Sequence, residues 1–219
     1  MNPPSIIIAD DHPLFREALG LALGKSFGTV TLHEAGSMEE LQLVSAAHSD
    51  ADLVLLDLHM PGVQGFSALV YLRAHHPELP VCVISANHSP SIVDRAMAHG
   101  AAAFIHKSAP VDDIHSVLST VLEGGLWQPQ APSSEPKAEE MDVASRISEL
   151  TPQQFRVLMM LTDGLLNKQI AHQIGISEAT VKAHLTAIFR KLGVSNRTQA
   201  SLLISRLDVD NSEATSSDF

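Results

Sequence analysis

The chain has 219 residues, which favours two domains over one, because a single domain usually has about 100–150 residues. Hydrophobic residues make up 45% of it, too many for a largely disordered protein, yet no apolar run reaches the ~18 residues that span a bilayer. Cys82 is the only cysteine, so intramolecular disulfides and four-cysteine zinc sites are excluded. The start of the chain lacks the basic region of a secretory signal, and we expect a cytoplasmic protein.

The net charge of −11 is distributed unevenly along the chain. Residues 148–207 hold 7 basic and 3 acidic residues, whereas the segments on either side are acidic. A basic module within an acidic protein indicates contact with nucleic acid.

Five short aliphatic runs alternate with amphipathic segments of helical length in the first 125 residues. Aliphatic runs without polar alternation are typical of strands buried on both faces of a parallel sheet. The expected strands are 5–9, 29–34, 53–56, 81–84 and 102–105, and the expected helices are 13–23, 38–47, 65–74, 91–98 and 110–122. The pattern predicts a doubly wound (βα)5 domain over residues 1–125.

Polar residues stand where these strands end. Asp10 and Asp11 follow the first strand, Asp57 the third, Ser85 the fourth and Lys107 the fifth. Ligands of such sheets bind outside the carboxyl ends of the strands, so we expect these side chains to share one crevice. Three carboxylates repel one another unless a cation lies among them, and hard oxygen ligands suit Mg²⁺, which usually binds a phosphate as well. The pattern predicts a phosphoryl group on a carboxylate nucleophile.

Each of these residues alone has an ordinary structural explanation, as a turn residue, a helix cap or a solvated lysine. Their occurrence at successive strand ends favours the site. The twelve histidines show no paired spacing of the zinc-site kind and are interpreted as surface residues. Cys82, in the middle of a strand, is interpreted as a small buried hydrophobe.

Four motifs resemble the signature blocks of two-component receiver domains over residues 5–124. They are IADDH at 8–12, LDLHMPG at 56–62, ISA at 84–86 and FIHK at 104–107. The resemblance implies that Asp57 accepts a phosphoryl group from a sensor histidine kinase. It also implies that Asp11, Asp57 and the backbone carbonyl of His59 bind Mg²⁺, with Asp10 acting through water. Three further residues are implied to respond to the phosphoryl group: Lys107 by pairing with it, Ser85 by moving toward it and Phe104 by turning inward.

Between this domain and the basic module, the composition changes to Pro, Ser, Glu and Ala. No apolar period survives there, so residues 126–146 are expected to form a semi-extended linker, with structure beginning again near its end. The acidic stretch 208–219 also lacks an apolar period and is expected to be disordered.

The basic module, residues 147–207, is helical by pattern. Thr151, Pro152 and Gln154 predict a capped helix to about residue 162, and Asn167 is expected to cap the helix 168–174. Ser177 is expected to cap a longer helix, 178–192, after a short glycine turn, which gives a helix-turn-helix, and a last helix covers 197–207. In the longer helix, the apolar face packs inward and Lys182, Ala183 and Thr186 are left to meet base edges. Periodicity alone favours an ordinary solvated face on a small helical bundle.

Further motifs resemble the LuxR-type effector domain of the NarL/FixJ subfamily over residues 148–205. They are LTP at 150–152, GLLNKQIA at 164–171, ISEATVKAHL at 176–185 and RKLGVSNR at 190–197. The resemblance implies base contacts from Lys182, Ala183 and Thr186, phosphate contacts from Lys168, Thr180, Arg190, Asn196 and Arg197, and a dimer seam along the last helix. The chain departs from the family at residues 153–156 and at Leu166, where relatives carry acidic residues and a serine cap, which puts local stability in doubt.

The two resemblances together imply a transcriptional regulator that is not an enzyme. When phosphorylated, it is expected to dimerise and to bind double-stranded DNA. Its resting form is expected to be a monomer whose recognition helix, 178–192, is partly covered by the receiver. One alternative is an Mg²⁺-dependent phosphatase, but such enzymes typically have a second acid where this chain has His59. Another is a phosphorylation-independent regulator with a degenerate receiver, although all five switch residues are present.

Overall fold

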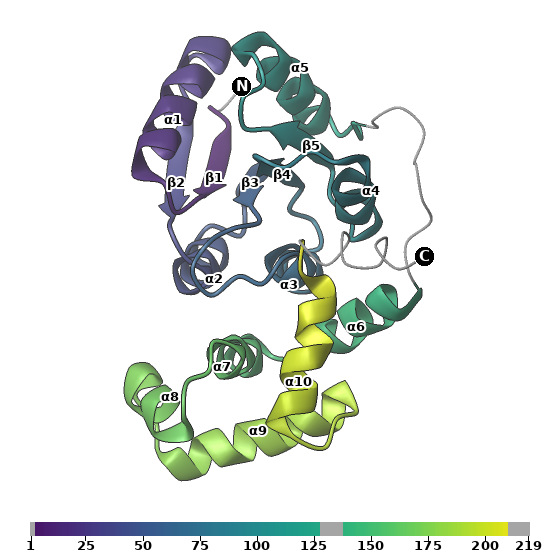
Figure 1. Ribbon diagram of the computed structural model, residues 1–219. Coiled ribbons are helices and arrows are strands. Elements are labelled where there is room, and N and C mark those ends of the chain that lie inside the picture. Colours follow the sequence, from purple (N-terminus) through teal and green to yellow (C-terminus); the bar gives the residue numbers. More distant parts are fainter. Residues whose placement is uncertain (1–2, 128–137, 210–219) are drawn as a thin grey trace.

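The computed structural model describes residues 3–127 and 138–209 (Figure 1). An α/β unit forms the N-terminal part and a set of helices forms the C-terminal part. Within those two ranges, no helix is both long and apolar enough to cross a lipid bilayer.

A five-stranded sheet of order β2-β1-β3-β4-β5 forms the centre of the first unit, and every neighbouring pair is parallel. The strands are β1 (Ser5–Ala9), β2 (Thr31–Ala35), β3 (Leu53–Asp57), β4 (Val81–Ser85) and β5 (Ala103–His106). All five residues of β3 and of β4 are buried, as their aliphatic runs predict. The predicted α/β fold is confirmed.

Side chains of the strands alternate between two cores, one on each face of the sheet. Ile6, Ile8 and Leu55 pack under α1 (Pro13–Phe27) and α5 (Val111–Leu122). Ile7 and Leu56 point to the other face. That second face is covered by α2 (Met38–Ala47), α3 (Ser67–His75) and α4 (Pro90–Ala98). The second core continues without a break into the C-terminal helices.

The C-terminal unit holds the predicted helix-turn-helix. Its elements are α6 (Ala138–Ser148), α7 (Pro152–Thr162), α8 (Asn167–Ile174), α9 (Glu178–Leu192), α10 (Arg197–Ile204) and the 3-10 turn η1 (Ser205–Leu207). Gly175 ends α8 with a φ of 70°, a left-handed conformation that favours glycine. Two residues later, the side chain of Ser177 accepts a hydrogen bond from the amide of Thr180 and caps α9.

Several details differ from expectation. Residues 138–146 were expected in the linker but lie in α6, whose Val143 and Ile147 are buried, so tertiary packing makes a helix where composition shows none. Asn167 is the first residue of α8 and Leu166 stands at the cap position, where its amide donates to the side chain of Gln169. Val209, expected in a disordered tail, is 1% exposed. The remaining linker residues, 128–137, and the tail, 210–219, lie outside the described residues.

The two units pack closely together, yet the receiver leaves the recognition helix uncovered. The rings of Tyr71 on α3 and Phe155 on α7 have centroids 5.0 Å apart, and the amide of Phe66 donates to the carbonyl of Leu207 over 3.0 Å. Figure 1 shows α9 on the side of the helical unit away from the sheet, with α10 running from α9 toward the sheet. The expectation of a covered recognition helix is therefore wrong: the sheet-bearing unit holds the far end of α10 instead.

Candidate functional site

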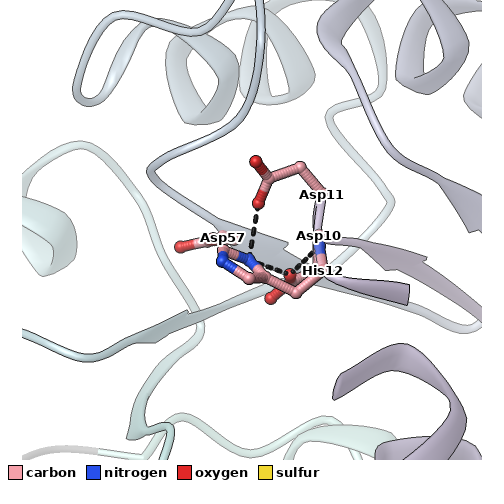
Figure 2. Close-up of side chains that lie close together, drawn as sticks. All are labelled: Asp10, Asp11, His12 and Asp57. Atoms are coloured by element: carbon pink, nitrogen blue, oxygen red, sulfur yellow. Dashed lines mark hydrogen bonds and ion pairs between the residues drawn. The ribbon is translucent and has the colours of Figure 1, made fainter. Parts of the chain in front are cut away.

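Three aspartates and a histidine meet at the carboxyl ends of β1 and β3 (Figure 2). Asp10, Asp11, His12 and Asp57 each offer a ligand atom, and these atoms all lie within 4.8 Å of one another. Asp10 is fully buried and Asp57 is 1% exposed, whereas Asp11 is half-buried. The parallel strands place these carboxylates together because β1 and β3 are neighbours in the sheet.

Lys107 supplies the positive charge of this acidic pocket. Its ammonium lies 2.6 Å from Oδ2 of Asp10 and 2.8 Å from Oδ2 of Asp57. The same nitrogen lies 4.9 Å from the centroid of the Phe15 ring. The lysine follows β5, and its stem crosses the end of β4 to reach the aspartates. The ammonium therefore stands beside the carboxylate that the sequence singles out as phosphoacceptor.

Burial and charge act in opposite directions on these groups. Burial raises the pKa of Asp57 above its ordinary value, and the hydrogen bond from Lys107 offsets only part of this. Burial lowers the pKa of Lys107, but its hydrogen bonds to Asp10 and Asp57 outweigh the burial, so the pKa lies above its ordinary value. The cation beside Asp57 therefore favours the ionised carboxylate, whereas burial favours the neutral acid.

The structure also locates the other predicted receiver residues. Ser85 at the end of β4 is fully buried, and its hydroxyl accepts a hydrogen bond from the amide of Asn87 over 3.2 Å. Phe104 on β5 is 4% exposed, so its ring already lies inside. Nδ1 of His59 is 3.9 Å from Oδ1 of Asp57, and its ring is half exposed.

His12 is a member of the pocket that sequence reasoning missed. Its Nδ1 lies 2.7 Å from Oδ1 of Asp11 and 3.1 Å from Oδ1 of Asp10, and its amide donates to Asp10 over 2.8 Å. The sequence places His12 directly after two aspartates and directly before Pro13, which begins α1. A proline restricts the backbone of the residue before it to extended conformations, and this was the available signal.

The helix-turn-helix presents most of the predicted DNA-contacting residues to solvent. Seven are exposed: Lys168, Thr180, Lys182, Ala183, Thr186, Arg190 and Asn196. The hydroxyl of Thr186 donates to the carbonyl of Lys182 over 3.0 Å. Lys182 itself makes only a loose pair with Glu178, 3.8 Å away. No other part of the described chain buries this surface, which extends from α8 to the start of α10.

Arg197 and Asn196 have clear structural roles at the start of α10. The guanidinium of Arg197 donates to the carbonyls of Leu161 and Leu165 over 3.1 and 3.0 Å, which satisfies the C-terminal end of α7. The side chain of Asn196 accepts from the amide of Gln199 and caps α10. Of the eight candidates, Arg197 is the one whose charge is turned into the protein.

An acidic pocket at strand ends, a lysine beside it and an exposed helix-turn-helix define a class of protein, the response regulators with a DNA-binding output domain. Comparison with protein families agrees: residues 6–119 match the response regulator receiver domain, and residues 148–204 match the bacterial regulatory proteins of the luxR family. The chain belongs to the response regulators that carry a LuxR-type DNA-binding domain, the NarL/FixJ type of two-component transcriptional regulator.

Curated relatives match over nearly their whole lengths. The chain is 38% identical to the glycerol metabolism activator of Pseudomonas putida, over 94% of this chain and 96% of the relative. It is 31% identical to the transcriptional regulatory protein DegU of Brevibacillus brevis, over 91% and 92%. Identity to the nitrate/nitrite response regulator protein NarL of Escherichia coli K12 is 28%, over 93% and 95%.

Solved structures share the fold. The RcsB response regulator of Salmonella typhimurium matches with a TM-score of 0.54 and 24% identity, over 94% of this chain and all of that one. The signal receiver domain of the putative response regulator NarL from Mycobacterium tuberculosis matches with a TM-score of 0.52 and 32% identity, over 57% of this chain and 99% of that one.

Proposed function

We propose that this response regulator is switched by phosphorylation of Asp57 by a sensor histidine kinase. The observation that carries the proposal is the position of Asp57: a buried carboxylate at a strand end, 2.8 Å from the ammonium of Lys107. A carboxylate so placed is a nucleophile with a fixed positive charge beside it, ready for a phosphoryl group. Lys107 would then pair with the phosphoryl oxygens, while Ser85 moves toward them and Phe104 repacks.

The donor set of the acidic pocket fits Mg²⁺. Three carboxylates converge there, and hard oxygen ligands with open positions suit this ion. Asp11, Asp57 and the backbone carbonyl of His59 would hold it, with Asp10 acting through water. When bound there, Mg²⁺ would supply positive charge to offset that of the phosphoryl oxygens.

The output of the switch is DNA binding. Lys182, Ala183 and Thr186 lie exposed on α9 for contact with base edges in the major groove. Phosphate contacts come from exposed residues around them, namely Lys168, Thr180, Arg190 and Asn196. Arg197, proposed from sequence as a phosphate contact, acts chiefly by joining α7 to α10 through its two carbonyl bonds.

Phosphorylation is proposed to control dimerisation along α10. Leu202 on this helix is 63% exposed, while η1, which directly follows the helix, contacts the receiver through Leu207. Freeing η1 lets two α10 helices pair and sets two recognition helices about 34 Å apart, one turn of DNA. A palindromic site is then bound by two modules at once.

The protein is proposed to act by binding, without turnover of a substrate, in the bacterial cytoplasm where the DNA lies. A phosphatase on the same aspartates is disfavoured because His59 stands where such enzymes typically have a second acid. In this proposal, residues 1–125 receive the signal, 126–146 connect the two units, 147–207 bind DNA and 208–219 form an acidic tail.

The test of Asp57 is direct. The protein is incubated with Mg²⁺ and the small phosphodonor acetyl phosphate, and its intact mass is measured. A gain of about 80 Da, one phosphoryl group, is expected in the wild type and in Asp112→Ala, a control on the exposed start of α5. The gain is absent from Asp57→Ala. Equal phosphorylation of Asp57→Ala contradicts the proposal.

A further inference from the structure

A second cluster of charged side chains lies between the two units, away from the acidic pocket. Glu140 on α6 is 5% exposed, and both of its oxygens accept from Nε of Arg95 on α4, over 2.9 and 3.0 Å. Nε2 of His99, just after α4, lies 2.8 Å from Oε1 of the same carboxylate. Outside the acidic pocket, Glu140 is the only buried carboxylate in the described parts of the chain.

The same arginine also holds the end of the DNA-binding unit. Nη2 of Arg95 donates to the carbonyls of Asp208 and Arg206 over 2.9 and 3.2 Å. These carbonyls belong to η1 and the residue after it, directly beyond the proposed dimerisation helix α10. One side chain of the receiver therefore joins α6 to the last turn of the DNA-binding unit.

Phe66 connects this cluster with the loop that follows the phosphoacceptor. Its buried ring lies 4.8 Å from the guanidinium carbon of Arg95 and 5.2 Å from the centroid of the His99 ring. Its amide donates to the carbonyl of Leu207 over 3.0 Å. A Cβ on the neighbouring Gly65 would lie 1.9 Å from that same carbonyl oxygen, so only glycine permits so close an approach. The loop from Asp57 to α3 thus ends in direct contact with η1.

The charges of the cluster are balanced as a set. Burial raises the pKa of Glu140, but its hydrogen bonds with His99 and Arg95 outweigh this and hold the pKa below its ordinary value. Nδ1 of His99 is buried with no hydrogen-bond partner, so the ring joins the cluster through Nε2 alone. One carboxylate then faces one guanidinium, and loss of either leaves a buried charge unpaired.

A neighbouring ion pair within the C-terminal unit is more exposed. Arg206 pairs with Glu139 at 3.2 Å, but their side chains are 51% and 79% exposed, and pairs of that kind contribute little. Glu139 and Glu140 are neighbours on one helix, have the same chemistry and differ in burial.

We infer that Glu140, Arg95 and His99 form an interdomain latch that holds η1 and the end of α10 on the receiver. The inference rests on the proposed function for its purpose, because release of the latch frees α10 to pair. Movement of the phosphoacceptor loop reaches the latch through Phe66, which contacts Arg95, His99 and Leu207. Opening of the interdomain latch then depends on a few contacts at α4, and the recognition helix itself does not change.

The amide of Phe66 reports on the latch, since its hydrogen-bond acceptor is the carbonyl of Leu207 in the other unit. Its hydrogen exchange is measured by NMR in unphosphorylated protein without a phosphodonor. Glu140→Gln is expected to speed this exchange at least about tenfold, because the amide opens when the units separate. Glu139→Gln, the matched control, is expected to exchange at the wild-type rate.

Two core amides, of Leu55 on β3 and Ile188 on α9, show whether the units stay folded. If Glu140→Gln loses their protection, the test is made with Arg95→Lys, which keeps the charge but lacks the fork that reaches Glu140 and η1 together. Faster exchange of Phe66 with both cores protected supports the latch. Exchange of Phe66 at the control rate in the folded variant overturns it. Failure of the proposed function would appear separately, as failure of Asp57 to gain a phosphoryl group.

Discussion

The ammonium of Lys107 lies between two buried carboxylates, 2.8 Å from Asp57 and 2.6 Å from Asp10. Its single positive charge offsets part of the negative charge of the three aspartates in the acidic pocket. It is also the group that a phosphoryl group on Asp57 would meet first. The same contact thus serves the stability of the unphosphorylated state and the recognition of the phosphorylated one.

Replacing Lys107 with alanine is expected to lower the free energy of unfolding by about 3 kcal/mol near neutral pH, because two buried carboxylates lose their cation. Mg²⁺ should restore part of the loss, so the ion raises the melting temperature of Lys107→Ala more than that of the wild type. Urea unfolding with and without Mg²⁺ measures both effects. Lys25→Ala, an exposed lysine near the end of α1, is the control. Equal stability of Lys107→Ala and the wild type would refute the electrostatic role.

Arg190 and Arg197 are predicted to have different roles in the same module, Arg190 in contacting DNA and Arg197 in stabilising the fold. Arg190→Ala should leave stability within about 0.5 kcal/mol and reduce the slope of log K against log salt by about one, as expected for loss of one phosphate contact. Arg197→Ala should instead cost about 1–3 kcal/mol of stability, because the carbonyls of Leu161 and Leu165 lose their donor. Thermal unfolding and DNA titrations at several salt concentrations check both. The assignment is contradicted if Arg190→Ala loses stability and Arg197→Ala shows only the reduced salt dependence of DNA binding.

Cys82 is predicted to be unreactive in the folded protein. Burial in the middle of β4 raises the pKa of its thiol to about 12, so almost no thiolate is present at pH 8. A thiol reagent at pH 8 should react only as fast as the sheet unfolds, and low urea should speed the reaction in step with unfolding. A rapid reaction in native buffer would show that the strand opens locally.

The interdomain latch is predicted to weaken in acid. The pKa of Glu140 in the folded chain lies below its ordinary value of 4.5. The stability that its charge contributes is therefore fully present above pH 4.5 and is lost as the pH falls through the lowered pKa. The exchange rate of the Phe66 amide, corrected for its intrinsic pH dependence, should rise over that window. Glu140→Gln should show no such rise, and a rise of equal size in that variant would assign the pH dependence to other groups.

The parallel sheet could be predicted from sequence because its signal is local. The run 53–56 is wholly aliphatic and β3 is wholly buried, so pattern and structure coincide. The acidic pocket followed from the strand ends for the same reason. The start and length of helix α6 could not be predicted, because it directly follows a Pro- and Ser-rich segment and it is stabilised by the burial of Val143 and Ile147 and by packing on α3. A helix of that kind depends on partners distant in the chain.

The arrangement of the two units was also beyond the sequence. The subfamily resemblance led us to expect the receiver over the recognition helix, yet it lies against η1. That arrangement depends on Tyr71 meeting Phe155 and on Arg95 meeting Glu140, pairs 84 and 45 positions apart. The local sequence around either residue of such a pair does not indicate that the residue lies at an interface. Arg197 shows the same limit, since one basic residue in a DNA-binding motif is turned inward.

The central claim is that Asp57 controls assembly, and the most direct measurement is the molar mass in solution by light scattering. Beryllofluoride with Mg²⁺ mimics the aspartyl phosphate, so the test needs no cognate kinase. Wild-type protein is predicted to shift from monomer to dimer when both are added, and Asp57→Ala is predicted to remain a monomer. An unchanged mass of the wild type, or the same shift in both proteins, would contradict the account.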